Sequence, residues 1–342
     1  MIWLLSAYRA DSHAAWADWL VAHLPEVDWR VRELPGRHFR WRIRGNPLSW
    51  LDELPGEPPR RILATSMVDI ATLRGLHPWL AAVPVDYYFH ENQFAYPVSP
   101  RQVRSVEPQI VQLYGALTAE RLLFNSQFNR DSFLDGVDDL LRRMPDAVPA
   151  GIRARLAPRC RVLPVPVTPL APQTRDPGLI LWNHRWEYDK APEVFADAVE
   201  RLAERNVDFR LALLGPRPQA TPEPLARIRQ RVPERIVADG RVSDADYRAL
   251  AGQAGVVVST ATHEFQGLAV LEACTAGARP LVPDALCYPE QYPPAHRYPP
   301  GDAAALAARL EAWLRDGLPP AVSVDDWLAS RLLPHWRALL TE

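Results

Sequence analysis

The stretch GVVVSTATHEFQGLAVLEACTAGARPLVP, residues 255–283, decides which fold class the chain of 342 residues can adopt. An apolar run of strand length at 256–259 is followed by a polar turn, by a helical segment that begins near Gly267, and by a second apolar run at 279–282. A strand, a helix and a further strand in this order build a unit whose two strands lie parallel in one sheet. The stretch therefore predicts an α/β fold.

The same alternation of apolar runs and helical segments continues through both halves of the chain. Strand candidates lie at 2–5, 61–64, 83–89, 121–124 and 160–165 in the first half, and at 179–182, 209–214, 235–238, 256–259 and 279–282 in the second. Helix candidates lie at 13–23, 108–117 and 127–143, and others begin near residues 191, 244, 267 and 302. Residues 163–178 contain five prolines, which is typical of a stiff linker.

This pattern predicts two Rossmann-like, doubly wound domains that face each other across a cleft. We expect domains at residues 1–165 and 166–342, with C-terminal helices able to pack back on the first domain. Such sheets bind ligands at the carboxyl ends of their strands.

Composition indicates a globular protein of the cytoplasm. The net charge is −2, 48% of the residues are hydrophobic and 23% are charged. No apolar run approaches the roughly 20 residues that span a bilayer, and the N-terminal MIWLLSAYRADS lacks the basic start of a signal peptide. The cysteines Cys160, Cys274 and Cys287 lack metal-ligand spacing, which indicates a reducing compartment and no structural zinc.

Glu264 and Glu272 flank the start of the helix near Gly267. Free amides at a helix start form an anion site, to which Gly267, Leu268 and Ala269 would contribute. Two acceptors around such a site suit the hydroxyls of a nucleotide-sugar on either side of its diphosphate. Alternatively, Glu264 caps the helix and Glu272 is a solvated helical residue.

Two cations follow the strand candidate at 179–182, in the sequence ILWNHRWEYDKA. Arg185 and Lys190 could bind a diphosphate from the side opposite the helix amides. Of the 39 basic residues, Lys190 alone is lysine, which suggests a need for a compact ammonium group. The alternative is an ordinary basic loop.

The strand candidate at 83–89 delivers His90, Glu91, Asn92 and Gln93 to an aromatic-rich loop. Four successive hydrogen-bonding side chains after a buried strand indicate a cleft or a surface. A buried histidine with satisfied hydrogen bonds is the alternative for His90.

The turn SAYRADSH places Ser12 and His13 at the start of the first helix. This helix start could bind an anion, although simple capping by Ser12 or Asp11 explains the same residues.

Other enzyme classes are excluded by motif. Neither HENQF nor HEFQG matches the metalloprotease pattern H-E-x-x-H. The sequence also contains no G-x-G-x-x-G and no Walker A motif.

Positive charge is concentrated between residues 30 and 44, where six arginines accompany one acid, Glu33. Within HFRWRIRG, apolar side chains alternate with Arg40, Arg42 and Arg44, which predicts a half-buried strand or ribbon with its arginines outward. Together with Arg37, these arginines are candidates to bind a polyanion. A solvated strand face is the alternative.

The motifs together resemble those of the retaining GT-B glycosyltransferases with an E-x7-E motif, and more closely those of the tRNA-queuosine mannosyltransferases. The closer resemblance is carried by LPGRHFRWRIRG, ATSMVDIATLRGL, YYFHENQFAYPV, LFNSQFNRDSFL, LWNHRWEYDKAPE, STATHEFQGLAVLEA and the YPE at 288–290, blocks that span roughly residues 1–292. The chain differs from this family at Gln266, where an aromatic is usual, and in SAYRADSH, where a Gly-Ser-His form is common.

The resemblance implies a retaining hexosyltransferase that moves mannose from GDP-mannose to the cyclopentene-diol of queuosine at the tRNA wobble position. Arg185 and Lys190 would neutralise the leaving diphosphate with help from the amides of residues 267–269. Glu264 would orient the hexose, Glu272 would bind the ribose, and His90 would lie near the anomeric carbon. The first domain would bind the acceptor tRNA and the second the nucleotide-sugar. Ser12 and His13 would contact the donor, and Glu91, Asn92, Gln93 and the arginines would contact the acceptor.

No metal or cofactor is expected, because cationic side chains replace the metal in such enzymes. Retention would proceed by attack from the front face, with a phosphate oxygen accepting the proton of the acceptor. Two alternatives stay open. One is a GT-B enzyme that uses another nucleotide-sugar and a lipid or small-metabolite acceptor. The other is a non-catalytic RNA-binding protein on a decayed scaffold.

Overall fold

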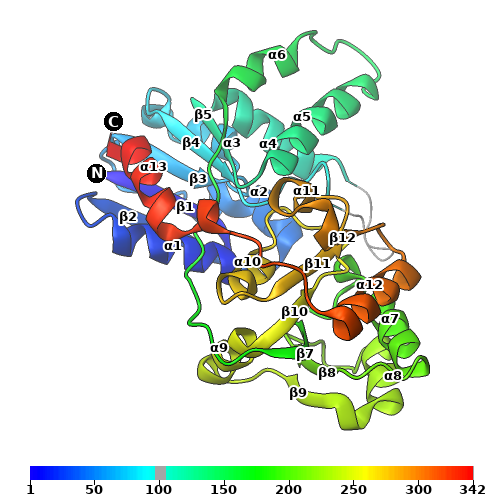
Figure 1. Cartoon of the computed structure of the whole chain (residues 1–342). Coiled ribbons are helices and arrows are strands. Elements are labelled where there is room, and N and C mark those ends of the chain that lie inside the picture. Colours follow the sequence, from blue (N-terminus) through cyan, green and yellow to red (C-terminus); the bar gives the residue numbers. More distant parts are fainter. Residues whose placement is uncertain (97–104, 342) are drawn as a thin grey trace. The chain divides into compact units, whose positions relative to one another are not determined.

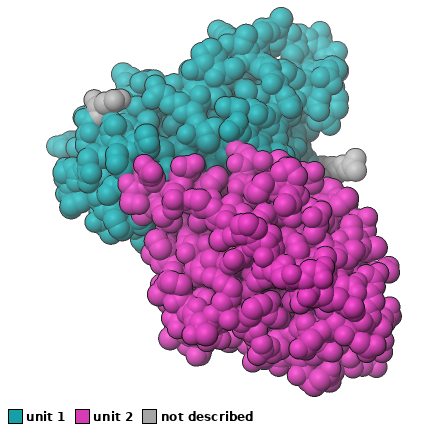
Figure 2. Space-filling view, viewed as in Figure 1, with its two compact units in different colours: residues 1–166, 332–342 teal, residues 167–331 magenta. Residues whose placement is uncertain are grey.

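The computed structural model of the protein describes residues 1–96 and 105–341 and divides into two compact units. Unit 1 contains Met1–Pro166 and Leu332–Glu342, and unit 2 contains Val167–Arg331 (Figure 2). The division falls one residue beyond the expected position, and the chain returns to unit 1 at its C-terminal end.

Unit 1 is built on a six-stranded parallel sheet of order β2-β1-β3-β4-β5-β6 (Figure 1). Its strands are β1 (Ile2–Arg9), β2 (Trp29–Pro35), β3 (Arg61–Thr65), β4 (Val85–Phe89), β5 (Arg121–Phe124) and β6 (Cys160–Val162). Its helices are α1 (Asp11–His23), α2 (Phe39–Ser49), α3 (Ile70–Leu76), α4 (Glu107–Thr118), α5 (Gln127–Arg142), α6 (Ile152–Leu156) and α13 (Ala329–Thr341).

Unit 2 contains a second six-stranded parallel sheet, of order β12-β11-β10-β7-β8-β9. Its strands are β7 (Asp176–Trp182), β8 (Arg210–Leu214), β9 (Ile236–Gly240), β10 (Ala254–Val258), β11 (Arg279–Pro283) and β12 (Arg297–Tyr298). Its helices are α7 (Pro192–Glu204), α8 (Glu223–Arg231), α9 (Asp244–Gln253), α10 (Leu268–Thr275), α11 (Tyr288–Gln291) and α12 (Ala303–Asp316).

The strand order of unit 2 reverses direction between β7 and β10. The chain winds outward from β7 through β8 to β9, and then returns to start β10 on the other side of β7. The loops after β7 and β10 therefore leave the carboxyl edge of the sheet side by side, which is where doubly wound sheets bind ligands. These loops carry Arg185, Lys190 and Glu264.

Helix α13 completes the core of unit 1. The Trp336 ring packs against the rings of Trp16 on α1 and Tyr88 on β4, with centroid distances of 5.7 and 5.3 Å. The buried Arg121 guanidinium donates a 2.8 Å hydrogen bond to the Leu339 carbonyl, and its Nε donates to Asp86 Oδ1 at 2.6 Å. The α13 residues thus complete a core with Trp16, Tyr88 and Arg121, the last of which lies 218 positions before Leu339.

The prediction of a strand or ribbon at HFRWRIRG is wrong, because these residues begin helix α2. The helix buries Ile43, Asn46, Pro47 and Trp50, whose spacing of three and four residues matches a helical face. The arginine-bearing strand of this region is β2, immediately upstream, where half-buried Trp29 and Val31 alternate with Arg30 and Arg32. Helices α3, α6 and α8 and the short strand β12 were also not expected from the sequence.

Candidate active site

The loops after β7 and β10 bring Lys190 and Glu264 together. Lys190 Nζ lies 3.0 Å from Glu264 Oε2, and it donates a 2.9 Å hydrogen bond to the His263 carbonyl. The Lys190 side chain is 10% exposed and that of Glu264 is 20% exposed. The predicted positive and negative members of the site are therefore direct partners, in a place that water reaches only in part.

Asp189 joins this ion pair to Arg185. Its carboxylate Oδ2 lies 3.4 Å from Lys190 Nζ and 3.4 Å from Arg185 Nη2, and the side chain is 3% exposed. Arg185 is half exposed and also lies 3.1 Å from Glu187. One buried carboxylate thus contacts both predicted diphosphate-binding cations and fixes their spacing. Asp189 was not predicted, although it directly precedes Lys190 in the sequence.

Glu264 and Lys190 are both held in their charged forms. Burial opposes the charge of Glu264, but the Lys190 ammonium, His184 and the Gly267 amide outweigh it and lower the Glu264 pKa to about 2. Burial also opposes the charge of Lys190, but Glu264 and Asp189 raise the Lys190 pKa above its ordinary value. The site therefore presents a fixed ammonium and a fixed carboxylate at neutral pH.

Gly267 shapes the start of α10. Its φ of +68° is left-handed, and a Cβ atom there would meet the Tyr288 ring at 3.0 Å. The Phe265 amide donates a 3.1 Å hydrogen bond to Glu264 Oε1, and the Gly267 amide helps to lower the Glu264 pKa, so the turn before α10 positions the Glu264 carboxylate. The amides of Leu268 and Ala269 are the next in the first turn, which helix geometry leaves without intrahelical acceptors.

Glu272 is bonded within unit 2 rather than solvated. Tyr247 on α9 donates a 2.6 Å hydrogen bond to Glu272 Oε2. Asn183, directly after β7, donates to the Tyr247 hydroxyl at 3.2 Å and to the Ala269 carbonyl at 2.9 Å. Burial raises the Glu272 pKa. Asn183 and Tyr247 were missed from the sequence because their partners lie 25 to 86 positions away.

In unit 1, His90 follows β4 and is buried in a cluster of rings. Its imidazole stacks on that of His13, with centroids 4.2 Å apart, and meets Trp16 and Tyr88 edge to face, each at 4.7 Å. Burial, with the neighbouring His13, lowers the His90 pKa well below its ordinary value. Within residues 1–96 and 105–341, no group bonds His90 Nε2. His90 is thus a neutral imidazole whose Nε2 stays unbonded.

The predicted helix-start residues Ser12 and His13 play different roles. His13 is buried, and its Nδ1 lies 2.9 Å from the Tyr8 carbonyl, so Nδ1 carries the proton. Ser12 is exposed in the first turn of α1, whose N-cap is Ala10 without a side-chain cap. Neither Ser12 nor Asp11 caps the helix, so the structure gives the simpler explanation of these residues no support.

Asn92 supports the loop after β4 from within. Its Nδ2 lies within 3.1 Å of the Asn129 carbonyl, Asn129 Oδ1 and Ser132 Oγ, and its Oδ1 accepts from the amides of Phe94 and Ala95. The side chain is fully buried. Both polar atoms of the Asn92 side chain are thus engaged within unit 1, so the side chain positions the loop after β4.

Asn129 of α5 and Asn125, directly after β5, continue this network toward His90. Asn129 donates to the Phe89 carbonyl and to Asn125 Oδ1 at 2.9 and 2.8 Å, and Asn125 donates to the His90 carbonyl at 2.8 Å. Gln112 on α4 accepts from the Gln93 amide at 2.7 Å. These buried amides fix the loop and leave Glu91 and Gln93 only half buried.

The predicted RNA-binding arginines divide by their place on α2. Arg37 and Arg40 are exposed at its start, whereas Arg42 is half buried on the other side of the helix. Arg44 is 49% exposed but lies 2.6 Å from the buried carboxylate of Asp69, which caps α3. Arg44 therefore anchors α2, and the exposed charge lies at Arg37 and Arg40.

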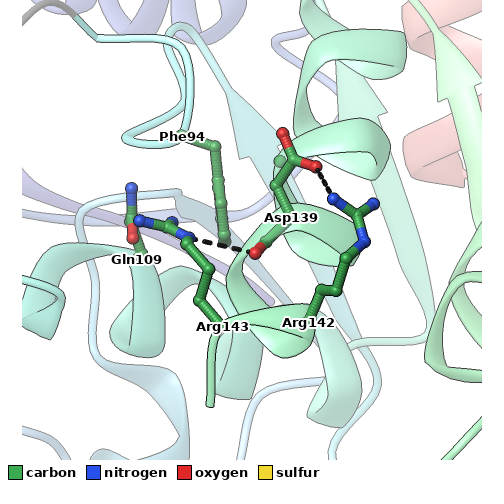
Figure 3. A pocket seen from close by; sticks show the side chains of 6 residues that line it. Phe94, Gln109, Asp139, Arg142 and Arg143 are labelled. Atoms are coloured by element: carbon green, nitrogen blue, oxygen red, sulfur yellow. Dashed lines mark hydrogen bonds and ion pairs between the residues drawn. The ribbon is translucent and has the colours of Figure 1, made fainter.

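A separate pocket of about 310 Å³ lies in unit 1 between α4, α5 and the residues after β4. Figure 3 shows Arg142 and Arg143 beside Asp139, with Phe94 and Gln109 opposite. Both arginines bond Asp139, one to its carboxylate at 2.8 Å and the other to its carbonyl at 3.1 Å. None of the residues predicted for the site lines this pocket.

Within the part of the chain that the structure describes, no group of three or more His, Cys, Asp and Glu side chains could hold a metal ion. No described helix is long and apolar enough to cross a membrane.

Comparison with known proteins identifies the family. The family profile "tRNA-queuosine alpha-mannosyltransferase N-terminal" matches residues 1–167, and "Glycosyl transferases group 1" matches residues 178–316. The tRNA-queuosine alpha-mannosyltransferase of Drosophila melanogaster is 34% identical over 329 residues, which cover 92% of this chain and 87% of the relative. The chain belongs to the tRNA-queuosine alpha-mannosyltransferase family. Its predicted class, a glycosyltransferase, is confirmed.

Solved structures show the fold of this family member. The lipopolysaccharide outer core galactosyltransferase WaaB has a TM-score of 0.68 at 11% identity, covering 99% of both chains. The sucrose-phosphate synthase of Thermosynechococcus elongatus has a TM-score of 0.68 at 15% identity, covering 100% of this chain and 94% of the other. The predicted α/β GT-B fold is therefore confirmed.

Proposed function

We propose that this protein transfers mannose from GDP-mannose, with retention, to the cyclopentene-diol of queuosine at the wobble position of tRNA. Membership of the family supports this reaction. The observation that carries the chemistry is the buried contact between Lys190 and Glu264, with Asp189 between Lys190 and Arg185. A site with two fixed cations and a fixed carboxylate suits a sugar bound to a diphosphate.

Unit 2 is assigned the donor. Arg185 and Lys190 neutralise the charge that grows on the diphosphate as its bond to the sugar breaks, assisted by the amides of Leu268 and Ala269. Glu264 is ionised and accepts hydrogen bonds from the hexose hydroxyls. Glu272, held by Tyr247, accepts from the ribose.

Transfer with retention needs one bond to break and one to form on the same face of the sugar. The bond from the anomeric carbon to the diphosphate oxygen breaks, and the acceptor hydroxyl oxygen bonds that carbon. The acceptor proton passes to a phosphate oxygen of the leaving diphosphate. The neutral imidazole of His90 is assigned a position near the anomeric carbon. This scheme requires no metal.

Unit 1 is assigned the acceptor. Glu91 and Gln93 lie half buried in the loop after β4, and Arg37 and Arg40 present positive charge at the start of α2. Because the net charge of the chain is −2, its overall charge does not attract RNA. The affinity then comes from local contacts between these arginines and the phosphates.

The test is incubation with GDP-mannose and queuosine-containing tRNA, followed by mass spectrometry of the wobble nucleoside. We expect a gain of one hexose, none on the same tRNA carrying guanine at that position, and none with Lys190→Ala. Parallel reactions with UDP-glucose, UDP-galactose and GDP-glucose test the choice of donor. Transfer to a lipid or a small metabolite, with no gain on queuosine tRNA, would overturn the proposal.

A further inference from the structure

Helix α2 carries an indole that does not join the core of unit 1. The Trp41 side chain is 52% exposed, in the first turn of the helix and beside the exposed Arg40. An exposed indole offers a large apolar face to a partner, and in a firmly held helix that face is presented in a fixed position.

Gly45 covers one face of this indole. A Cβ atom at Gly45 would lie 2.5 Å from Trp41 Cε2 and 2.7 Å from Cδ2 and Cζ2. Because Cε2 and Cδ2 form the bond shared by the two rings, a point so close to all three atoms lies above the ring plane. The ring therefore rests flat on the glycine, and its other face accounts for the exposure.

The helix that carries the indole is firmly held. Asn46 is fully buried, and its Nδ2 donates to the Met67 carbonyl at 3.1 Å while its Oδ1 accepts from the Asp69 amide at 3.1 Å. Arg44 lies 2.6 Å from Asp69, and the Phe39 ring meets that of Tyr8 at the end of β1. Trp41 is thus a flat apolar surface fixed at the carboxyl edge of the unit 1 sheet.

We propose that Trp41 stacks on an unpaired base of the tRNA while Arg37 and Arg40 contact the adjoining phosphates. Exposed aromatic faces beside cations are the features by which proteins bind unpaired RNA, because every base offers a π-face and every phosphate a negative charge. The positive charge at 37 and 40 favours RNA over an apolar protein partner. The inference rests on the proposed function for the identity of the RNA, but not for the stacking itself.

The test compares Trp41→Ala, Trp41→Leu and Trp41→Phe with the wild type in binding to queuosine-containing tRNA at fixed salt. Stacking contributes enough that Ala and Leu should raise Kd about 5- to 150-fold, whereas Phe, which keeps a flat ring, should stay within about threefold of the wild type. The matched control is Leu48→Ala, since Leu48 is 60% exposed on the same helix. It should change Kd less than about twofold, as expected for a surface residue without a contact.

Salt and RNA structure separate stacking from charge. Trp41→Ala should leave the slope of log Kd against log salt unchanged, while Arg40→Gln should reduce it by about 1. The Trp41 effect should persist on an isolated anticodon stem-loop and vanish on fully paired RNA. A Trp41→Ala variant that binds tRNA within twofold of the wild type, or loses as much affinity for duplex RNA, overturns the inference.

Failure of the inference and of the proposed function give different results. If the wild type adds hexose to queuosine and Trp41→Ala binds tRNA normally, the inference alone fails. If no hexose is added but Trp41→Ala weakens binding to the stem-loop, the proposed reaction alone fails. Thermal unfolding of each variant confirms that the exposed substitution leaves the fold intact.

Discussion

Lys190 Nζ lies 3.0 Å from Glu264 Oε2, although the two residues are 74 positions apart in the chain. Unit 2 creates this contact by placing β7 beside β10 at the point where its strand order reverses. The same contact links catalysis to stability, because it places an ammonium among carboxylates that are removed from water. The predictions below use this link.

Lys190→Ala should abolish transfer and also destabilise unit 2. Without the ammonium, Glu264 and Asp189 remain as buried carboxylates, a change that costs about 3 to 5 kcal/mol of unfolding free energy. Urea unfolding measures this cost, with Arg142→Ala as the control, because the Arg142–Asp139 pair is exposed at 72% and 62% and should cost less than about 1 kcal/mol. Wild-type transfer by Lys190→Ala would contradict the site assignment.

Glu264→Gln should remove an acid-sensitive part of the stability. The folded-state pKa of Glu264 is about 2, below its ordinary value of 4.5. The stabilisation is therefore complete above about pH 4.5 and is lost as the pH falls toward 2, and it amounts to about 3 kcal/mol. The unfolding free energies of wild type and variant should therefore differ at pH 6 and lie closer together at pH 3. An equal difference at both pH values would show that Glu264 is not held as an anion.

His13 should produce a second loss of stability at higher pH. Burial lowers the His13 pKa from 6.5 to about 4, so the folded state favours the neutral ring. The unfolded chain takes up the proton first, and stability that is complete above pH 6.5 falls by about 3 kcal/mol as the pH approaches 4. His13→Gln should make the unfolding free energy fall less steeply between pH 7 and pH 4.5, and the remaining slope should come from other buried histidines with lowered pKa values, among them His90, His184 and His263. A wild-type curve that is already flat there would contradict the prediction.

Gly267→Ala should weaken donor binding through two effects that a control can separate. Its left-handed φ alone costs a non-glycine residue about 1 to 2 kcal/mol, and its new methyl group would also meet Tyr288 at 3.0 Å. Gly301 has a similar φ of +75° but no atom within 4 Å of an added Cβ, so Gly301→Ala isolates the backbone cost. We expect a raised KM for the donor only in Gly267→Ala. Equal KM values in the two variants would remove Gly267 from the site.

Arg40 and Arg44 should respond differently to substitution despite their shared helix. Arg40→Glu should raise the KM for tRNA and lower its salt dependence, because an exposed cation is replaced by an anion. Arg44→Gln should instead lower the unfolding free energy by about 1 to 3 kcal/mol, since the buried Asp69 carboxylate loses its partner. Steady-state kinetics at two salt concentrations and urea unfolding measure the two effects. A loss of stability in Arg40→Glu together with a raised KM for tRNA in Arg44→Gln would contradict the structure.

Sequence patterns predicted the parts of the fold that depend on local composition. Apolar runs such as 121–124 and 256–259 can only be central strands of a sheet covered on both faces, and they are. The alternation in HFRWRIRG was misleading, because a run as short as residues 39–44 can belong either to a strand or to a helix. The helix is decided by Asn46, whose buried hydrogen bonds to Met67 and Asp69 are not local in sequence.

The sequence likewise predicted some residues of the candidate site and missed others. Lys190 and Glu264 could be predicted because each lies in a polar loop between a strand and the start of a helix. Glu272, which lies within α10, could be predicted from its spacing from Glu264. Asn183 and Tyr247 act through hydrogen bonds to distant segments, so no local pattern reveals them. Asp189 contacts Arg185 and Lys190, which are its neighbours in the sequence, but nothing in that stretch distinguishes it from the other acidic residue of the loop, Glu187. Asn92 was predicted to contact the acceptor because the sequence shows a polar side chain after a buried strand. The sequence does not show that this side chain is engaged in hydrogen bonds within unit 1.

The return of α13 to unit 1 has a consequence for the order of events during synthesis. The Trp336 ring and the Leu339 carbonyl complete contacts with Trp16, Tyr88 and Arg121, yet the ribosome makes all of unit 2 before it reaches them. Unit 1, although translated first, must wait with part of its apolar face uncovered until the whole second unit has emerged. Folding of the nascent chain is therefore expected to finish in the opposite order to its translation.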